Sequence, residues 1–231
     1  MISKTECRDC MEAMREFPDK FFDLAVVDPP YGIHQHGGKN KTRSRMAKAK
    51  DYKPFAGMDK EPPPRRYFEE LIRVSKNQVI WGANHFLSRL GARDSHCWLI
   101  WDKDNFGSNF ADCELAWTSF DSAVRKFSFR WNGMMQGDMA NKEERIHPTQ
   151  KPVSLYAWIL GKYAKPGDKI LDTHLGSGSS RIAAYDLGLD FWGYEIDREY
   201  FDLQEKRFAR HAAQRSLFDP PEEDLGEQMS L

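Results

Sequence analysis

An acidic residue, two prolines and a tyrosine directly follow an apolar segment near the start of the chain. Residues 21–27, Phe-Phe-Asp-Leu-Ala-Val-Val, run into Asp28-Pro29-Pro30-Tyr31. Proline cannot donate to a strand ladder and restricts the residue before it, so the simplest interpretation is a strand that ends here. The chemical interpretation is that Asp28 and the Pro29 carbonyl accept the two N–H groups of an amine, while Tyr31 offers a ring face for stacking. The tripeptide Asp-Pro-Pro recurs in the polar tail, so it does not decide between the two interpretations alone.

A glycine turn follows a second apolar segment. Residues 169–180 read Lys-Ile-Leu-Asp-Thr-His-Leu-Gly-Ser-Gly-Ser-Ser, which predicts a strand, an acid at Asp172 and a turn that opens a helix. Glycines let the backbone approach a ligand closely and adopt positive φ. No Gly-Lys-Ser/Thr follows, and Arg181 stands where a dinucleotide motif has its third glycine. An ordinary strand–helix turn is the alternative.

Glu195 ends the next apolar segment, Phe-Trp-Gly-Tyr-Glu, and strengthens the ligand interpretation. An acid at the tip of the strand that follows a glycine turn can bind a ribose diol. A nucleoside that carries no pyrophosphate indicates S-adenosylmethionine. Asp28 at a neighbouring strand tip would then hold the methyl acceptor, an exocyclic amine of a nucleobase.

Strands alternate with helices along most of the chain, which predicts a mostly parallel sheet with helices on both faces. In such sheets ligands bind beyond the carboxyl ends of the strands, where Asp28 and Asp172 both fall. The expected strands are Leu24–Val27, Gln78–Trp81, Trp98–Trp101, Glu114–Trp117, Lys169–Leu171 and Phe191–Tyr194, and the expected helices are Cys10–Glu16, Tyr67–Val74, Val153–Tyr163, Ser180–Leu187 and Asp197–Ala212.

Length and composition favour one α/β domain in a reducing compartment. The 231 residues, of which 40% are hydrophobic, can bury one sizeable core. The sequence contains neither an apolar run of membrane-spanning length nor the apolar segment of a signal peptide, so we expect a cytoplasmic protein with no membrane partner. Cys7 and Cys10 have the spacing of a metal or redox pair, but Cys97 and Cys113 do not, so we expect no metal site.

Two segments carry cations that could contact a polyanion. Residues 33–66 begin with a basic, glycine-containing stretch, which is interpreted as a mobile arm, with a solvated loop as the alternative. Residues 119–146 are aromatic, basic and irregular, which is typical of a small target-recognition insertion. Phe129 and Trp131 could stack on bases or form a small core. The candidate DNA-binding residues are Lys39, Lys41, Arg43, Arg45, Arg125 and Arg130.

The motifs and their order resemble the β class of DNA amino-methyltransferases. DPPY precedes HPTQKP (residues 147–152), which precedes DTHLGSGSS and GYEID, so the catalytic half comes before the cofactor half. The resemblance implies the three-layer αβα fold of S-adenosylmethionine-dependent methyltransferases, over a domain of residues 1–213. It implies a catalytic set of Asp28, Pro29, Pro30 and Tyr31. It implies cofactor contacts from Asp9, Cys10, Asp28, Thr149, Lys151, Asp172, His174, Gly176, Ser177, Gly178, Glu195 and Ile196. His174 departs from the usual phenylalanine of the family.

The activity that the resemblance implies is methyl transfer from S-adenosylmethionine to adenine N6 in duplex DNA, with the base flipped out. Aspartate at position 28 is commoner among adenine enzymes of this family, whereas serine is commoner among N4-cytosine enzymes. An N4-cytosine DNA methyltransferase and a non-catalytic DNA-binding homologue are the alternatives. The family is typical of restriction–modification systems, in bacteria or encoded by phages. A homodimer is left open.

The last residues form an acidic tail, residues 214–231, which we expect to be flexible. Its start, Gln214-Arg215-Ser216-Leu217-Phe218, resembles the peptide by which bacterial proteins dock on the sliding clamp. An exposed Leu-Phe pair on a solvated tail is an apolar anchor for a partner pocket. The alternative is that Leu217 and Phe218 fold back on the domain.

Overall fold

The computed structural model describes residues 1–33, 59–91, 94–105, 111–132 and 135–216. Most of the expected arm, including Lys39, Lys41, Arg43 and Arg45, lies outside the described residues, as do Leu217 and Phe218 of the tail.

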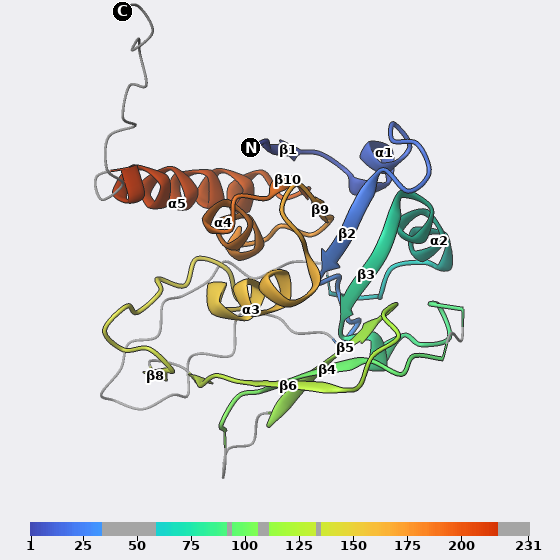
Figure 1. The fold of residues 1–231 in the computed structure, drawn as a ribbon, viewed down its shortest axis with the longest axis horizontal. Coiled ribbons are helices and arrows are strands. Elements are labelled where there is room, and N and C mark those ends of the chain that lie inside the picture. The colour runs from blue at the N-terminus through green and yellow to red at the C-terminus, as the bar shows by residue number, and fades with distance from the viewer. Residues whose placement is uncertain (34–58, 92–93, 106–110, 133–134, 217–231) are drawn as a thin grey trace, which may run out of the picture.

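A single eight-stranded sheet runs through the described part of the chain (Figure 1). Its spatial order is β1-β10-β9-β2-β3-β5-β4-β6, and every neighbouring pair is parallel except the two pairs that β5 makes. The strands are β1 (Ser3–Cys7), β2 (Phe22–Val27), β3 (Ser75–Trp81), β4 (Trp98–Asp102), β5 (Cys113–Thr118), β6 (Arg125–Ser128), β9 (Lys169–Asp172) and β10 (Asp190–Glu195). A separate antiparallel pair is formed by β7 (Trp131–Asn132) and β8 (Met135–Gln136).

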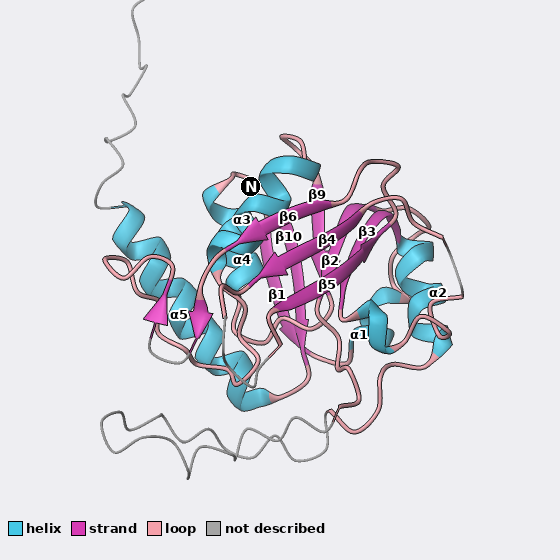
Figure 2. Ribbon diagram, turned by 90° about the horizontal axis from the view of Figure 1, so that it is seen from below, coloured by secondary structure: helices cyan, strands magenta, loops and turns pink. Residues whose placement is uncertain are grey.

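Helices cover both faces of the sheet and make three layers (Figures 1 and 2). On one side lie α1 (Cys10–Met14) and α2 (Arg65–Val74). On the other lie α3 (Val153–Tyr163), α4 (Ser179–Asp186) and α5 (Arg198–Ser216). The mostly parallel αβα fold expected from the sequence is confirmed.

Two apolar cores, one on each face, result from the alternation of side chains along the central strands. Val26 and Ile170 point towards α3 and α4, whereas Val27 and Leu171 point towards α1 and α2. Both faces of these strands are therefore buried, which is why they read as continuous apolar runs in the sequence.

The apolar runs predicted the central strands to within a few residues, but two edge strands were not expected. β1, Ser-Lys-Thr-Glu-Cys, is largely polar, and its place is set by backbone pairing with β10, from Ser3 opposite Phe191 to Cys7 opposite Glu195. β6 pairs only with β4 in the described sheet. Edge strands bury one side at most, so their side chains carry little periodic signal.

The chain changes direction across the sheet between β2 and β9. From β2 it continues to β3 on one side, and from β9 it continues to β10 on the other. In parallel sheets, ligands bind at such a switch point, beyond the carboxyl ends of the two strands. Asp28 follows β2 and Asp172 ends β9, so both acids lie at this point.

No helix in the described ranges is long and apolar enough to cross a membrane.

Candidate active site

Asp28 lies in a cluster of polar side chains that converge from four parts of the chain. Lys151 Nζ donates to Asp28 Oδ2 at 2.6 Å, to Tyr31 Oη at 3.0 Å and pairs with Glu114 Oε2 at 3.0 Å. The Tyr31 hydroxyl lies 2.6 Å from Asp28 Oδ1 and 3.3 Å from Glu114 Oε2. Lys103 Nζ pairs with the other oxygen of Glu114. We call Asp28, Tyr31, Lys151, Glu114 and Lys103 the acceptor cluster.

The acceptor cluster holds two acids and two lysines, so its charges are balanced. The pKa values of its two acids, Asp28 and Glu114, are shifted in opposite directions. Burial raises the pKa of Asp28, although Lys151 opposes this shift. Burial would also raise the pKa of Glu114, but Lys151 and Lys103 together outweigh it and lower the pKa to about 2. Burial would lower the pKa of Lys151, yet Asp28 and Glu114 outweigh it and raise the pKa. Glu114 and Lys151 are therefore charged at neutral pH, while Asp28 is the group best placed to take up a proton.

Tyr31 is held by contacts to its ring and its backbone. The His85 ring stacks on it, with centroids 5.2 Å apart and an interplanar angle of 16°. Gly82, at φ +70°, lies against the ring so closely that a Cβ there would sit 2.1 Å from Tyr31 Cε1. Asp59 Oδ1 accepts the backbone N–H groups of Tyr31 and Gly32 at 2.8 and 2.9 Å. Burial holds the pKa of Tyr31 well above its usual value, so its hydroxyl remains a donor.

The glycine turn between β9 and α4 lies beside the second pair of acids. Asp172 accepts the Ser180 hydroxyl at 2.5 Å and the His174 backbone N–H at 3.0 Å. Glu195 accepts the Gly176 N–H at 2.8 Å and the Asp197 N–H at 2.9 Å, one on each oxygen. Burial raises the pKa of Asp172 to about 7. The two halves of the site adjoin because β2, which ends before Asp28, pairs with β9, which ends at Asp172.

Gly176 has a backbone conformation that favours glycine. It has φ +51°, and a Cβ built on it would be in van der Waals contact with the His147 ring at 3.7 Å. A carboxylate oxygen accepts more than one hydrogen bond, so Glu195 retains acceptor capacity for a diol. A bare backbone at positive φ beside a strand-tip carboxylate fits a nucleoside ligand. Gly178, at φ +72°, instead packs against Gln204, which indicates a structural reason for this second glycine.

Other expected cofactor residues lie around the end of β1 and the glycine turn. The Asp9 carboxylate caps α1 by accepting the Met11 N–H at 2.7 Å. Burial raises the pKa of Cys10 to about 12, so its thiol is neutral. Burial lowers the pKa of His174 to about 4, and its ring packs edge-on against Tyr67 at 5.4 Å. Ile196, beside Glu195, is 57% exposed, which leaves an apolar surface at the rim.

The HPTQKP segment connects the two halves. Lys151 lies against Asp28, in the acceptor cluster. Thr149 Oγ1 lies 3.1 Å from Nδ1 of His147, and burial lowers the pKa of His147 to about 4. Ser177 lies on the glycine-turn side, where its hydroxyl contacts Ser179. The segment therefore bridges from the glycine turn to Asp28.

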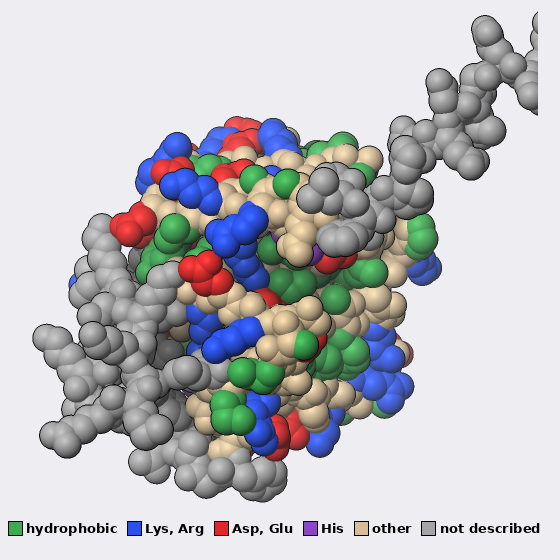
Figure 3. Space-filling model, turned by 90° about the vertical axis from the view of Figure 1, so that its left-hand side faces the viewer, with side chains coloured by type: hydrophobic (Ala, Val, Ile, Leu, Met, Phe, Trp, Pro, Cys, Tyr) green, Lys and Arg blue, Asp and Glu red, His purple; other side chains and the backbone are tan. Residues whose placement is uncertain are grey.

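The residues proposed for target recognition differ in exposure and in their partners. Arg125 is exposed on β6, while Arg130 pairs with Asp104. Trp131 is buried, and its indole N–H donates to the Gln150 carbonyl at 2.7 Å. Trp131 belongs to the apolar core on the α3 and α4 face of the sheet, and it anchors the HPTQKP segment. On the face shown in Figure 3, Lys and Arg side chains lie among acidic and apolar ones.

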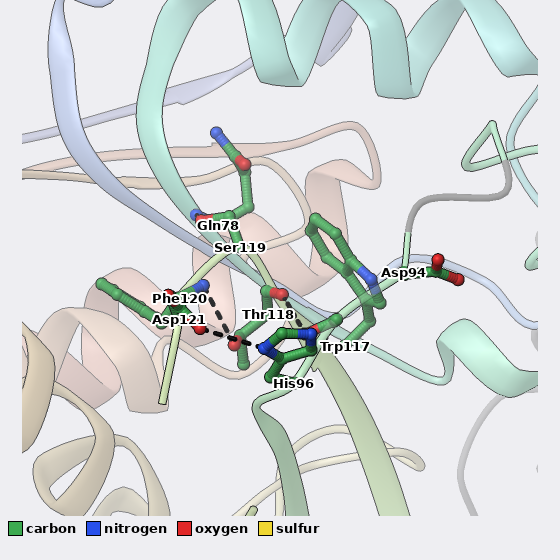
Figure 4. Close-up of a pocket in the computed structure, with 9 residues that line it drawn as sticks. Gln78, Asp94, His96, Trp117, Thr118, Ser119, Phe120 and Asp121 are labelled. Carbon is green, nitrogen blue, oxygen red and sulfur yellow. Dashed lines mark hydrogen bonds and ion pairs between the residues drawn. The ribbon is translucent and has the colours of Figure 1, made fainter. Parts of the chain in front are cut away.

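A hollow of about 460 Å³ lies at the opposite edge of the sheet, near the start of β4 and the end of β5 (Figure 4). Its lining includes the His96–Asp121 pair, whose side chains are 79% and 93% exposed. None of the predicted site residues lines it.

Glu114, Lys103, Gly82, His85, Asp59 and Tyr67 were not predicted to belong to the site. Glu114 joins the acceptor cluster because β5 is antiparallel to its neighbours, which brings the start of β5 to the edge where the other strands end. Lys103 reaches Glu114 because it directly follows the end of β4 at that edge. Of these residues, Gly82 is the one that the sequence could have identified, because a glycine directly after an apolar strand is typical of a turn with positive φ.

Comparison with known proteins gives matches over most of the chain. A family model described as DNA methylase, of the N6/N4 type, matches residues 98–206. The type II methyltransferase M.HinfI of Haemophilus influenzae is 27% identical, over 86% of this chain and 66% of its own length. The type II methyltransferase M2.MboI of Moraxella bovis is 25% identical, over 87% of this chain and 85% of its own length. The crystal structure of M1.HpyAVI with SAM has a TM-score of 0.56 at 21% identity, covering 90% of this chain and 100% of that one.

Proposed function

We propose that the chain is a DNA methylase of the N6/N4 type and that it transfers a methyl group from S-adenosylmethionine to N6 of adenine in duplex DNA. The observation that carries this proposal is the position of Asp28. It follows β2 at the switch point of the sheet, and β2 pairs with β9, which ends at Asp172 before the glycine turn. A methyl acceptor and a nucleoside cofactor held there would lie side by side.

S-adenosylmethionine supplies an activated methyl group on its sulfonium. Glu195 would accept the ribose hydroxyls, and the bare backbone at Gly176 would let the nucleoside approach. Ile196 offers an apolar surface to the adenine ring. Thr149, Ser177 and Cys10 would line the rest of the cofactor site. This assignment is supported by the positive φ of Gly176 and by the spare acceptor capacity of Glu195.

Asp28 and the Pro29 carbonyl would accept the two N–H groups of the target amine. An exocyclic amine is a weak nucleophile because its lone pair is delocalised into the ring, and two acceptors favour the pyramidal nitrogen of the transition state. The nitrogen would bond to the methyl carbon while the bond from this carbon to the sulfonium sulfur breaks, and a neutral thioether would leave. The nitrogen would release one proton, and the raised pKa of Asp28 suits it to receive that proton.

The target base would leave the helix to reach Asp28, because the Asp28 side chain is only 14% exposed within the acceptor cluster. Tyr31 would stack on the base with the ring face that His85 does not cover. Arg125, on an exposed strand next to β4, is a candidate for a DNA contact, together with Arg130 and the four cations of the arm. The aspartate at position 28 favours adenine over cytosine.

Labelled methyl transfer into unmethylated duplex DNA, followed by digestion to nucleosides, tests this function. We expect label in the nucleoside of N6-methyladenine. Label in N4-methylcytosine would keep the amine chemistry and overturn the choice of base. Absence of label from both, with folded protein and bound S-adenosylmethionine, would overturn the function.

A further inference from the structure

Both oxygens of the Asp28 carboxylate already have partners. Oδ1 accepts the Tyr31 hydroxyl at 2.6 Å, and Oδ2 accepts Lys151 at 2.6 Å. A target amine that donates to one of these oxygens shares it with the donor already there, and the oxygen becomes a stronger acceptor for the amine when that donor turns to another acceptor. A donor that loses its acceptor inside a buried site costs free energy unless a second acceptor lies within reach.

Glu114 provides that second acceptor for Tyr31. Its Oε2 lies 3.3 Å from the Tyr31 oxygen, so the hydroxyl hydrogen reaches it by rotation about the C–O bond without movement of the ring. The carboxylate is fixed on both sides, because Lys103 pairs with Oε1 and Lys151 with Oε2. Lys151 is less able to leave Asp28 for another acceptor, because its three hydrogens already face Asp28, Tyr31 and Glu114.

We propose that Glu114 is a positioning residue for methyl transfer, the acceptor to which the Tyr31 hydroxyl turns when the target amine takes its place on Asp28. The exchange moves one hydrogen bond and no charge. The amine N–H donates to Asp28 Oδ1, the Tyr31 hydroxyl donates to Glu114 Oε2, and Lys151 keeps both carboxylates. Glu114 itself does not touch the substrate. This inference rests on the proposed amine methylation.

Single-turnover methyl transfer to DNA tests it through a double-mutant cycle of Glu114→Gln and Tyr31→Phe. In the parent, Glu114→Gln is expected to slow transfer roughly tenfold or more, because a charged acceptor is lost. In the Tyr31→Phe background no hydroxyl hydrogen needs a new acceptor, so the same change is expected to alter the rate by no more than about threefold. Dissociation constants for S-adenosylmethionine and DNA should stay within about threefold of the parent's throughout.

Asp23→Asn is the matched control. Asp23 is on the same strand as Asp28, pairs with Lys76 at 2.6 Å and is exposed to a similar degree as Glu114, 22% against 21%, but it lies at the other end of β2. Its transfer rate should match the parent's. If Glu114→Gln does not fold, Glu114→Gln with Lys103→Met restores the charge balance and carries the same cycle.

Equal losses from Glu114→Gln in both backgrounds, or no loss in the parent, would overturn the inference while leaving the methyltransferase function intact. A folded parent that binds S-adenosylmethionine but transfers no methyl to either base would overturn the proposed function and this inference with it.

Discussion

Asp172 is a buried carboxylate and Glu114 a half-buried one at the same edge of the sheet, yet their pKa values are shifted in opposite directions. Asp172 has neutral donors, the Ser180 hydroxyl and the His174 N–H, and burial raises its pKa to about 7. Glu114 lies between two lysines, which outweigh the same effect and lower its pKa to about 2. Whether a partner carries a full charge therefore decides which acid stays ionised.

Asp172→Asn should remove a pH dependence of stability. A raised pKa means that the folded state holds a proton that the unfolded state releases, so stability falls as the pH rises from about 4 to about 7. The fall is at most about 4 kcal/mol, because each tenfold change in a proton dissociation constant corresponds to about 1.4 kcal/mol. Urea unfolding of parent and variant at several pH values measures it. Identical slopes in both proteins would contradict the prediction.

At the scale of elements, strand direction decides which residues reach the site. Asp28, Asp172 and Glu195 were predicted because each follows or ends an apolar run whose direction the alternation of helices and strands implies. Glu114 begins its strand, and nothing in the composition of Glu114–Trp117 shows that this strand runs against its neighbours. The acceptor half of the site was predictable from sequence, whereas its ion-pair partners depended on the sheet topology.

Gly82 illustrates how an element's end supports a side chain. It follows β3 at φ +70°, and the Tyr31 ring lies where a Cβ would be. Gly82→Ala should displace that ring and slow methyl transfer roughly tenfold or more, with S-adenosylmethionine affinity unchanged.

Gly91→Ala is the control for this prediction. Gly91 has a similar φ of +84° and no atom within 4 Å of an added Cβ, so it shares the backbone strain without the clash. Both variants should lose roughly 1–2 kcal/mol of stability from the left-handed conformation, measured by thermal unfolding. Equal transfer rates in the two variants would show that Gly82 does not position Tyr31.

At the scale of the whole molecule, the order of motifs and the switch point agree. The acceptor half, from β2 to β6, precedes the cofactor half, β9 and β10, and the two meet at the β2–β9 pair. Motif order along the chain predicted this division, but not the place of β1, a polar strand that joins the cofactor half by pairing with β10. The cations of the arm remain a prediction from sequence.

The tail prediction also belongs to the whole molecule. Removal of residues 214–231 takes away Gln214, Leu217 and Phe218, and should abolish binding to a bacterial sliding clamp without changing methyl transfer to short DNA. Leu217→Ala with Phe218→Ala, in the full-length chain, should have the same effect, because the apolar anchors carry the contact. Binding can be measured by surface plasmon resonance. Undiminished clamp binding by both variants would remove the hypothesis.

The role of Asp28 as acceptor for the target amine is tested most directly by single-turnover transfer of labelled methyl to adenine in DNA, with Asp28→Ala beside the parent and the Asp23→Asn control. We expect Asp28→Ala to slow transfer roughly 100-fold or more while the dissociation constant for DNA changes little, because the lost contacts matter most in the transition state. An Asp28→Ala rate equal to the parent's, with N6-methyladenine still formed, would contradict the account.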